Sequence, residues 1–211
     1  MVSREDGRYI GSAEGADEVT YEQRSAPTTE AQPAMTELWS AEEVSAGIAR
    51  LADQLAAAYS AEDTVNVLPV MTGALYFAAS LTMELERRAP GRWLIAPVYA
   101  SAYGDEHATA SAEVLLPPGF DERVRPESPT LIVDDVLDTG VTMQRLLEVL
   151  EERGLSPVSV AVLVNKPHHR TIGRDPDYAA FTTDTEHWLV GYGMDHERRF
   201  RGLDSVRYLD A

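Results

Sequence analysis

Residues 130–150 read TLIVDDVLDTGVTMQRLLEVL, and this stretch decides the fold. It begins with the apolar run TLIV, which predicts a buried strand, and it ends with apolar residues at every third or fourth position from 143 to 150, which predict one face of a helix. Two acidic residues, Asp134 and Asp135, lie where the strand ends. A strand that passes directly into a helix is typical of α/β proteins.

The same alternation of short apolar runs and amphipathic segments continues on both sides. Helices are expected after Ser40, which begins a Ser-x-x-Glu capping box, and after Gly73. The expected strands are residues 65–71, 93–99, 112–116, 130–133, 158–164, 178–182 and 188–190. This pattern predicts a parallel sheet covered on both faces by helices, with ligands bound at the carboxyl ends of the strands.

Two segments lack any apolar period. Residues 1–37 mix Gly, Pro, Thr and Glu, so we expect a disordered N-terminal arm, followed by one domain over residues 38–211. Residues 100–111 are small and polar and are long enough to act as a lid over a bound ligand. The chain therefore predicts one folded domain with a mobile arm and a candidate lid.

Composition excludes several classes of function. The chain has 211 residues, 44% of them hydrophobic, a net charge of −17 and no cysteine. It can bury a sizeable core, cannot be a disulfide scaffold, and is not attracted to nucleic acid or anionic lipid by its overall charge. With no apolar run long enough to span a bilayer and no secretion signal, the expected location is the cytoplasm. Lys166 is the only lysine, which by itself suggests a codon bias towards arginine.

The loop after the predicted strand 130–133 is suited to bind an anion. The backbone N–H groups at a helix start lack partners, Gly140 allows close approach of a ligand, and Thr139 and Thr142 add hydroxyl donors. Asp134 and Asp135 would repel a phosphate unless they serve sugar hydroxyls, a magnesium ion or proton transfer. The acidic pair could also simply cap the end of the strand. Receiver domains and Asp-x-Asp phosphatases fit the spacing of these acids less well.

Residues 133–142, VDDVLDTGVT, resemble the phosphoribosyl-diphosphate (PRPP) motif of type I phosphoribosyltransferases. From residue 38 to 209 the chain is similar to hypoxanthine-guanine phosphoribosyltransferases, including Asn165-Lys166-Pro167, residues 178–181 (YAAF), residues 189–195 (LVGYGMD) and Arg201. The resemblance implies the type I phosphoribosyltransferase fold, a parallel sheet flanked by helices with a small hood from the C-terminal segment. It also implies a homodimer or homotetramer.

By that resemblance, Asp134 and Asp135 hold the ribose hydroxyls of PRPP, and Asp138 is the general base that accepts the N7 proton of a purine. The residues implied for the 5-phosphate are Asp138, Thr139, Gly140, Val141 and Thr142, and those implied for the diphosphate are Thr72, Gly73 and Arg201. Asp195 and Asp134 are implied ligands or neighbours of Mg²⁺.

The resemblance also assigns the base pocket. Lys166 would donate to the exocyclic O6 of a purine, which favours 6-oxopurines, because an ammonium cannot accept from the amino group of adenine. Trp188 would stack on the base and the backbone of Leu189 would meet its edge, although Trp188 alone could be an ordinary core aromatic.

Two positions depart from the family pattern. Met71-Thr72-Gly73 replaces the usual Leu-Lys-Gly and loses a cation, and Ala102-Tyr103 in the lid replaces Ser-Tyr and loses a hydroxyl. These changes leave open a PRPP-dependent enzyme with a non-purine acceptor in specialised metabolism. A non-catalytic regulator that senses PRPP or a nucleotide is a further alternative. The main hypothesis is Mg²⁺-dependent transfer of phosphoribose to hypoxanthine or guanine.

The five histidines, His107, His168, His169, His187 and His196, show no metal-ligand spacing with another histidine or acid on a predicted helix. They are expected to be surface residues.

Overall fold

The computed structural model describes residues 2–5, 8–11, 33–103, 111–155 and 157–210. The chain divides into two compact units, Met1–Pro33 and Ala34–Ala211. In the first unit β1 (Val2–Glu5) pairs antiparallel with β2 (Arg8–Gly11). The larger unit begins a few residues before the predicted boundary at residue 38, and the prediction that residues 1–37 are disordered remains a prediction.

The larger unit contains a central seven-stranded sheet. Its strands are β4 (Val65–Met71), β5 (Trp93–Ile95), β6 (Val98–Tyr103), β7 (Ser111–Leu115), β8 (Thr130–Leu137), β9 (Val158–Asn165) and β10 (Tyr178–Thr182). They lie in the order β10-β9-β8-β4-β6-β7, and β5 also pairs with β4. Every pair is parallel except β6 with β7. The predicted parallel α/β sheet is confirmed.

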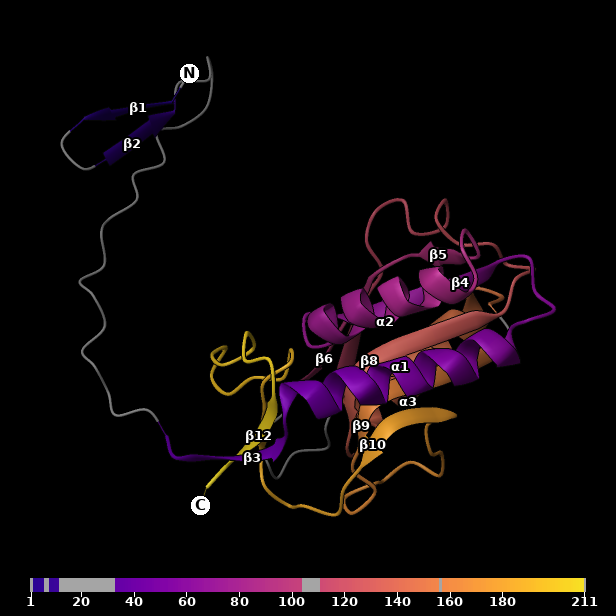
Figure 1. Cartoon of the computed structure of the whole chain (residues 1–211). Helices are drawn as coiled ribbons and strands as arrows, with labels where there is room; N and C mark the ends of the chain where they lie inside the picture. The colour runs from indigo at the N-terminus through magenta and orange to yellow at the C-terminus, as the bar shows by residue number, and fades with distance from the viewer. Residues whose placement is uncertain (1, 6–7, 12–32, 104–110, 156, 211) are drawn as a thin grey trace. The chain divides into compact units, whose positions relative to one another are not determined.

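Three helices pack on this sheet (Figure 1). They are α1 (Ala41–Ala58), α2 (Leu75–Arg88) and α3 (Val141–Glu152). The capping box predicted at the start of α1 is present, because the Ser40 hydroxyl accepts from the Glu43 backbone N–H and the Glu43 carboxylate accepts from the Ser40 N–H. Such a reciprocal cap satisfies two donors that the first helical turn otherwise leaves free.

Alternation along the buried strands divides the core into two clusters. In β8, Leu131 and Val133 join α1 and α2 in one cluster, while Ile132 between them joins α3 in the other. Successive side chains of a strand point to opposite faces, so helices α1 and α2 cover one face of the sheet and α3 covers the other. This is the two-sided covering that the apolar runs predict.

A second, smaller sheet forms the hood. It consists of β11 (Leu189–Val190), β12 (Val206–Leu209) and β3 (Met35–Trp39), antiparallel and in that order. The sequence pattern missed β3 and β12, because both strands are short and their pairing partners lie far away in the chain. The hood is therefore built from both ends of the larger unit. Trp39 of β3 stacks on Phe181 of β10 at 4.4 Å and joins the hood to the central sheet.

Two expected boundaries are corrected. The strand expected over residues 93–99 is two strands, β5 and β6, and β6 continues to Tyr103 while β7 begins at Ser111. Most of the expected lid at residues 100–111 therefore either belongs to this antiparallel hairpin or, at residues 104–110, lies outside the described residues. Within the described part of the chain, no helix has the length and apolar character needed to cross a membrane.

The topology separates two loops at the carboxyl ends of β4 and β8, and the region between these loops is called the crevice below. Strands β4 and β8 are parallel neighbours, yet the helix after β4 (α2) covers one face and the helix after β8 (α3) covers the other. Loops that leave in opposite directions from adjacent parallel strands separate at their carboxyl ends, which is where α/β proteins bind ligands. The predicted site residues on the loops after β4 and β8 lie at these strand ends.

Candidate active site

Residues 138–142, which run from the end of β8 into the first turn of α3, are called the phosphate loop of the site. Gly140 adopts a positive φ of 85° and immediately precedes α3, whose first residue is Val141. A side chain at Gly140 would also meet Ile172, at 2.4 Å from its Cγ1. Glycine is therefore required here for both conformation and space. The first backbone N–H groups of α3 are left free of helical partners, as an anion site needs.

Asp134 and Asp135 lie near the end of β8, where little water reaches them. Burial raises the pKa of the Asp134 carboxyl well above its ordinary value, and the neighbouring charge of Asp135 raises it further. Burial also raises the pKa of Asp135, partly offset by a hydrogen bond from Asp134 and by the positive charge of Arg201. Two adjacent carboxyl groups in this position favour ligands that donate hydrogen bonds or carry positive charge.

Lys166 and Asp138 form the polar centre of the site. Lys166 follows β9, is 5% exposed, and places its Nζ 3.3 Å from Oδ2 of Asp138. The same ammonium donates to the backbone carbonyl of His187 at 3.1 Å. The second oxygen of Asp138, Oδ1, is buried and finds no hydrogen-bond partner among the described residues. The pair therefore presents a cationic donor next to a free carboxylate acceptor.

A clamp that the sequence analysis missed holds the phosphate loop. The Arg170 guanidinium donates to the carbonyls of Asp138 at 2.6 Å and Leu137 at 2.8 Å, and to Oδ1 of Asn165 at 2.6 Å. Thr171 adds a backbone N–H to the carbonyl of Thr139 at 2.9 Å. An arginine at this position carries no local motif, and only its closeness to Asn165-Lys166-Pro167 could have drawn attention to it.

The loop after β4 closes the other wall of the crevice. A Cβ at Gly73 would lie 2.2 Å from Oδ2 of Asp135, so this loop passes directly over the acidic pair. A Cβ at Gly193 would lie 1.9 Å from the carbonyl oxygen of Gly73. Thr72 stands next to this contact, at the position where the resemblance implies the diphosphate. Two glycines thus allow the hood segment and the β4 loop to touch through their backbones.

The segments on both sides of β11 supply three more of the predicted residues, Trp188, Asp195 and Arg201. Arg201 pairs with Asp195 at 2.5 Å and donates to the carbonyl of Gly193 at 2.6 Å. The indole N–H of Trp188 donates to the carbonyl of Asp195 at 2.6 Å, and the Trp188 side chain is otherwise exposed. Trp188 is therefore no core aromatic, and its ring is available to a ligand.

These contacts bring about half of the predicted residues together. Asp138 pairs with Lys166, which donates to the carbonyl of His187. The adjacent Trp188 donates to Asp195, and Asp195 pairs with Arg201. Arg201 donates to Gly193, which lies against Gly73, and Gly73 lies against Asp135 of β8. Leu189 is buried and pairs with Tyr208 of β12. Ala102 and Tyr103 lie in β6, paired with β7. Base contact by Leu189 and a lid at Ala102 and Tyr103 remain predictions.

Comparison with protein families agrees with this geometry. The family model described as phosphoribosyl transferase domain matches residues 35–197. This match spans the central sheet, the phosphate loop and the first half of the hood segment. The chain belongs to this family, and its class is therefore that of the phosphoribosyltransferases.

Curated relatives narrow the class. A hypoxanthine-guanine phosphoribosyltransferase of Lactococcus lactis is 33% identical over 143 residues, which cover 68% of this chain and 74% of the relative. A hypoxanthine phosphoribosyltransferase of Escherichia coli is 29% identical over 165 residues, covering 78% and 89%. Within its class the chain falls with the hypoxanthine-guanine phosphoribosyltransferases, as its motifs predict.

Solved structures show the same fold. The hypoxanthine phosphoribosyltransferase of Trypanosoma cruzi matches with a TM-score of 0.74 and 22% identity, over 87% of this chain and 95% of that one. The enzyme of Staphylococcus aureus matches with a TM-score of 0.72 and 21% identity, over 83% and 91%. The predicted type I phosphoribosyltransferase fold is confirmed.

Proposed function

We propose that the chain transfers the 5-phosphoribosyl group from PRPP to a 6-oxopurine, hypoxanthine or guanine, releasing diphosphate. The observation that carries this is the buried pair of Lys166 and Asp138, with their side chains 3.3 Å apart. A 6-oxopurine carries the O6 acceptor beside the N7 proton on one edge. The pair offers the complementary donor and acceptor side by side.

The reaction follows from the roles of these groups. N9 of the purine attacks the anomeric carbon, and the bond from that carbon to diphosphate breaks. The base must then lose its proton on N7. We assign that proton to Asp138, whose Oδ1 has no hydrogen-bond partner among the described residues. The carboxylates of Asp134 and Asp135 also stabilise positive charge that develops on the ribose ring.

PRPP is bound by the rest of the phosphate loop and by the loop after β4. The free N–H groups at the start of α3 and the hydroxyls of Thr139 and Thr142 bind the 5-phosphate. Asp134 and Asp135 accept hydrogen bonds from the ribose hydroxyls, which offset the burial and the mutual repulsion that raise the pKa of Asp134. Arg201 and the backbone at Gly73 bind the diphosphate.

Magnesium fits the donor set of this site. Mg²⁺ prefers oxygen ligands, and the crevice offers the closely packed carboxylates of Asp134 and Asp135, with Asp195 on the hood side. When bound, the ion neutralises the charge of the leaving diphosphate. Asp195 pairs with Arg201, so each of these side chains helps to orient the other towards the diphosphate.

We further propose a cytoplasmic homodimer or homotetramer. Support comes from α2, where Leu75, Tyr76 and Met83 are large apolar side chains left 44%, 43% and 57% exposed. Exposed apolar residues gathered on one helix favour contact with another copy of the chain.

A substrate screen tests the reaction. The full chain, PRPP and Mg²⁺ are combined in turn with hypoxanthine, guanine, xanthine, adenine and a set of non-purine amines, and nucleotide and diphosphate are measured. We expect turnover with hypoxanthine or guanine and a preference over adenine. Absence of turnover with both oxopurines, together with activity on an amine, would replace this proposal with the non-purine acceptor.

The selectivity residue has its own test. Lys166→Gln keeps a donor but removes the charge, and Lys166→Arg keeps the charge but spreads it over a wider fork. Both variants are expected to lose most of the preference for 6-oxopurines over adenine, measured as the ratio of kcat/KM values. An unchanged ratio in both would show that Lys166 does not select the base.

A further inference from the structure

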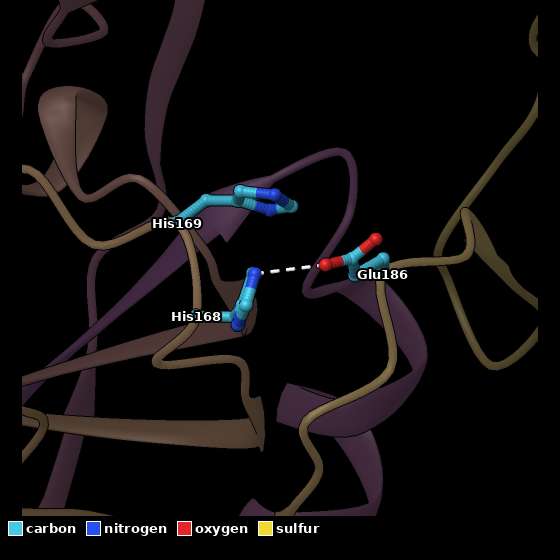
Figure 2. A group of neighbouring side chains, drawn as sticks. All are labelled: His168, His169 and Glu186. Carbon is cyan, nitrogen blue, oxygen red and sulfur yellow. Dashed lines mark ion pairs between the residues drawn. The ribbon is translucent and has the colours of Figure 1, made fainter.

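Two histidines and a glutamate form a cluster at the edge of the active site. His168 and His169 follow β9, and Glu186 precedes β11. One potential ligand atom of each side chain lies within 4.8 Å of the others, and all three side chains are exposed (Figure 2). The sequence spacing could not indicate this group, because tertiary folding brings Glu186 to the histidines.

The chemistry of this cluster differs from that of the acidic pair. Two imidazoles and a carboxylate are the ligands of zinc sites that keep a fourth position open for water. Magnesium prefers oxygen ligands alone, so it would not compete effectively for such a set. We propose that His168, His169 and Glu186 form a binding site for a divalent transition metal such as Zn²⁺, separate from the magnesium site.

The distances are compatible with such an ion after small side-chain rotations. A tetrahedral zinc ion with ligands at about 2.0–2.1 Å holds neighbouring ligand atoms roughly 3.3 Å apart. Nε2 of His168 lies 2.8 Å from Oε1 of Glu186, so these two atoms must move slightly apart to bind the same ion. The rings of His168 and His169 are nearly perpendicular, at 85°, with centroids 4.8 Å apart. Their exposure leaves these side chains free to rotate.

A carboxylate already lies behind the cluster. Nδ1 of His169 is 3.7 Å from Oδ1 of Asp138, which leaves Nε2 as the ring nitrogen for the metal. Histidines that bind a metal usually donate their other ring N–H to a carboxylate. Oδ1 of Asp138 is available for this role, since no described residue donates a hydrogen bond to it.

The site is therefore coupled to catalysis. Metal binding orients the Nδ1–H of His169 towards Oδ1 of Asp138. In the proposed reaction this oxygen accepts the N7 proton of the base. An occupied site slows turnover by engaging that acceptor. This coupling to catalysis rests on the proposed function, whereas the metal site itself does not.

Metal binding is tested on the full chain after treatment with a chelator. Zn²⁺ is titrated by calorimetry and Co²⁺ by visible absorption, both with Mg²⁺ in large excess. We expect one high-affinity ion per chain, and binding at least about tenfold weaker in His168→Ala and in Glu186→Gln. His187→Phe is the matched control, because it removes a neighbouring imidazole but keeps the ring that stacks on Tyr208.

Three results would overturn the metal site. One is the absence of Zn²⁺ and Co²⁺ binding to the wild type under these conditions. Another is equal binding by the wild type and both cluster variants, which would place the ion elsewhere on the chain. Loss of binding in His187→Phe to the same extent would also assign the ion to a different set of ligands.

The link to Asp138 has a readout that does not depend on activity. Asp138→Ala removes the carboxylate behind His169 and is expected to weaken Zn²⁺ binding about tenfold, as loss of such a partner typically does. Zn²⁺ affinity equal to that of the wild type would overturn the coupling while leaving the metal site in place.

Turnover gives the second readout. With saturating Mg²⁺ and PRPP, Zn²⁺ is expected to inhibit the wild type, and His168→Ala is expected to keep its activity when Zn²⁺ is added. Equal inhibition of both proteins would show that Zn²⁺ acts at the magnesium site instead. If the wild type turns over no base at all, the proposed function fails, and the calorimetric result still decides the metal site.

Discussion

The phosphate loop and the hood form opposite sides of the crevice, and they are built in different ways. The phosphate loop is one continuous segment, residues 138–142, that joins the buried strand β8 to the first turn of α3. The hood combines strands from residues 35–39, 189–190 and 206–209. The loop takes its path from one continuous stretch of chain and is held by a single clamp from Arg170 and Thr171, whereas the hood forms only when three distant segments pair. Changes in the loop should therefore affect chemistry most, and changes in the hood should affect assembly of the site.

The largest expected effect comes from the phosphate-loop side. Asp138→Asn removes the acceptor for the N7 proton and should lower kcat by roughly a hundred- to ten-thousand-fold. PRPP binding, measured by calorimetry, should stay close to that of the wild type, because the free N–H groups of α3 remain. Turnover that is unchanged in the variant would contradict the assigned base, and lost PRPP binding would indicate a structural role instead.

The clamp at Arg170 should give the next largest effect. Its side chain is 8% exposed and donates to the carbonyls of Leu137 and Asp138. Arg170→Ala removes the donor to the Asp138 carbonyl and to Oδ1 of Asn165, while the Leu137 carbonyl keeps the Lys166 N–H, and should lower the free energy of unfolding by about 1.5–3 kcal/mol. Urea denaturation measures this. Arg170→Lys should recover only part of the loss, since one ammonium cannot span the same acceptors. Full recovery would show that charge alone matters.

A glycine substitution tests the contact between the hood and the β4 loop. Gly193→Ala places a Cβ against the carbonyl oxygen of Gly73 at a residue whose φ is 107°. We expect a loss of about 1–3 kcal/mol in stability together with weaker PRPP binding. Gly91→Ala is the control, because its φ is also positive, at 76°, while no atom lies within 4 Å of the added Cβ. If Gly193→Ala and Gly91→Ala changed PRPP affinity equally, the contact between Gly193 and Gly73 would not be what PRPP binding depends on.

The acidic pair predicts a smaller, pH-dependent effect on the metal-free protein. Burial raises the pKa of Asp134 and Asp135, so the folded chain holds protons that the unfolded chain releases above about pH 3.9. The stability that protonation contributes is complete below that pH and is lost as the pH rises through the raised pKa values.

Asp135→Asn removes the buried Asp135 carboxyl and its charge beside Asp134, whereas the burial of Asp134 remains. The variant should gain stability relative to the wild type as the pH rises, by about 1.4 kcal/mol for each unit of raised pKa that the substitution removes. Thermal or urea unfolding from pH 4 to 8 with a chelator present measures the difference. A difference that does not change with pH would contradict the raised pKa values. The same variant should bind PRPP less well.

Much of the phosphate-loop side could be predicted from sequence. The apolar run before Asp134 and the Asp-Thr-Gly-x-Thr pattern after it lie within one short segment, and local spacing determines both the strand and the helix start. The central strand 65–71 was predicted with its observed bounds, because it is buried along almost its whole length. Lys166 and Trp188 were identified by resemblance to a family.

The hood side could be predicted only in part. Strands β3 and β12 have few residues and no strong alternation, and their pairing depends on partners at the other end of the chain. The clamp by Arg170 and the cluster of His168, His169 and Glu186 carry no local pattern either. Interactions between residues far apart in the sequence leave no periodic signal in either segment.

The α/β class, the anion-binding loop and the types of residue available for chemistry follow from local spacing and side-chain identity, and the amino-acid sequence contains both. How these parts combine depends on tertiary packing. Tertiary packing places the Lys166 ammonium beside Asp138 and brings Gly193 against the β4 loop. It also buries Asp134 and Asp135, and this burial raises their pKa values. Distances and burial of this kind arise only when separate segments pack together, since they depend on neighbours that the linear chain does not show.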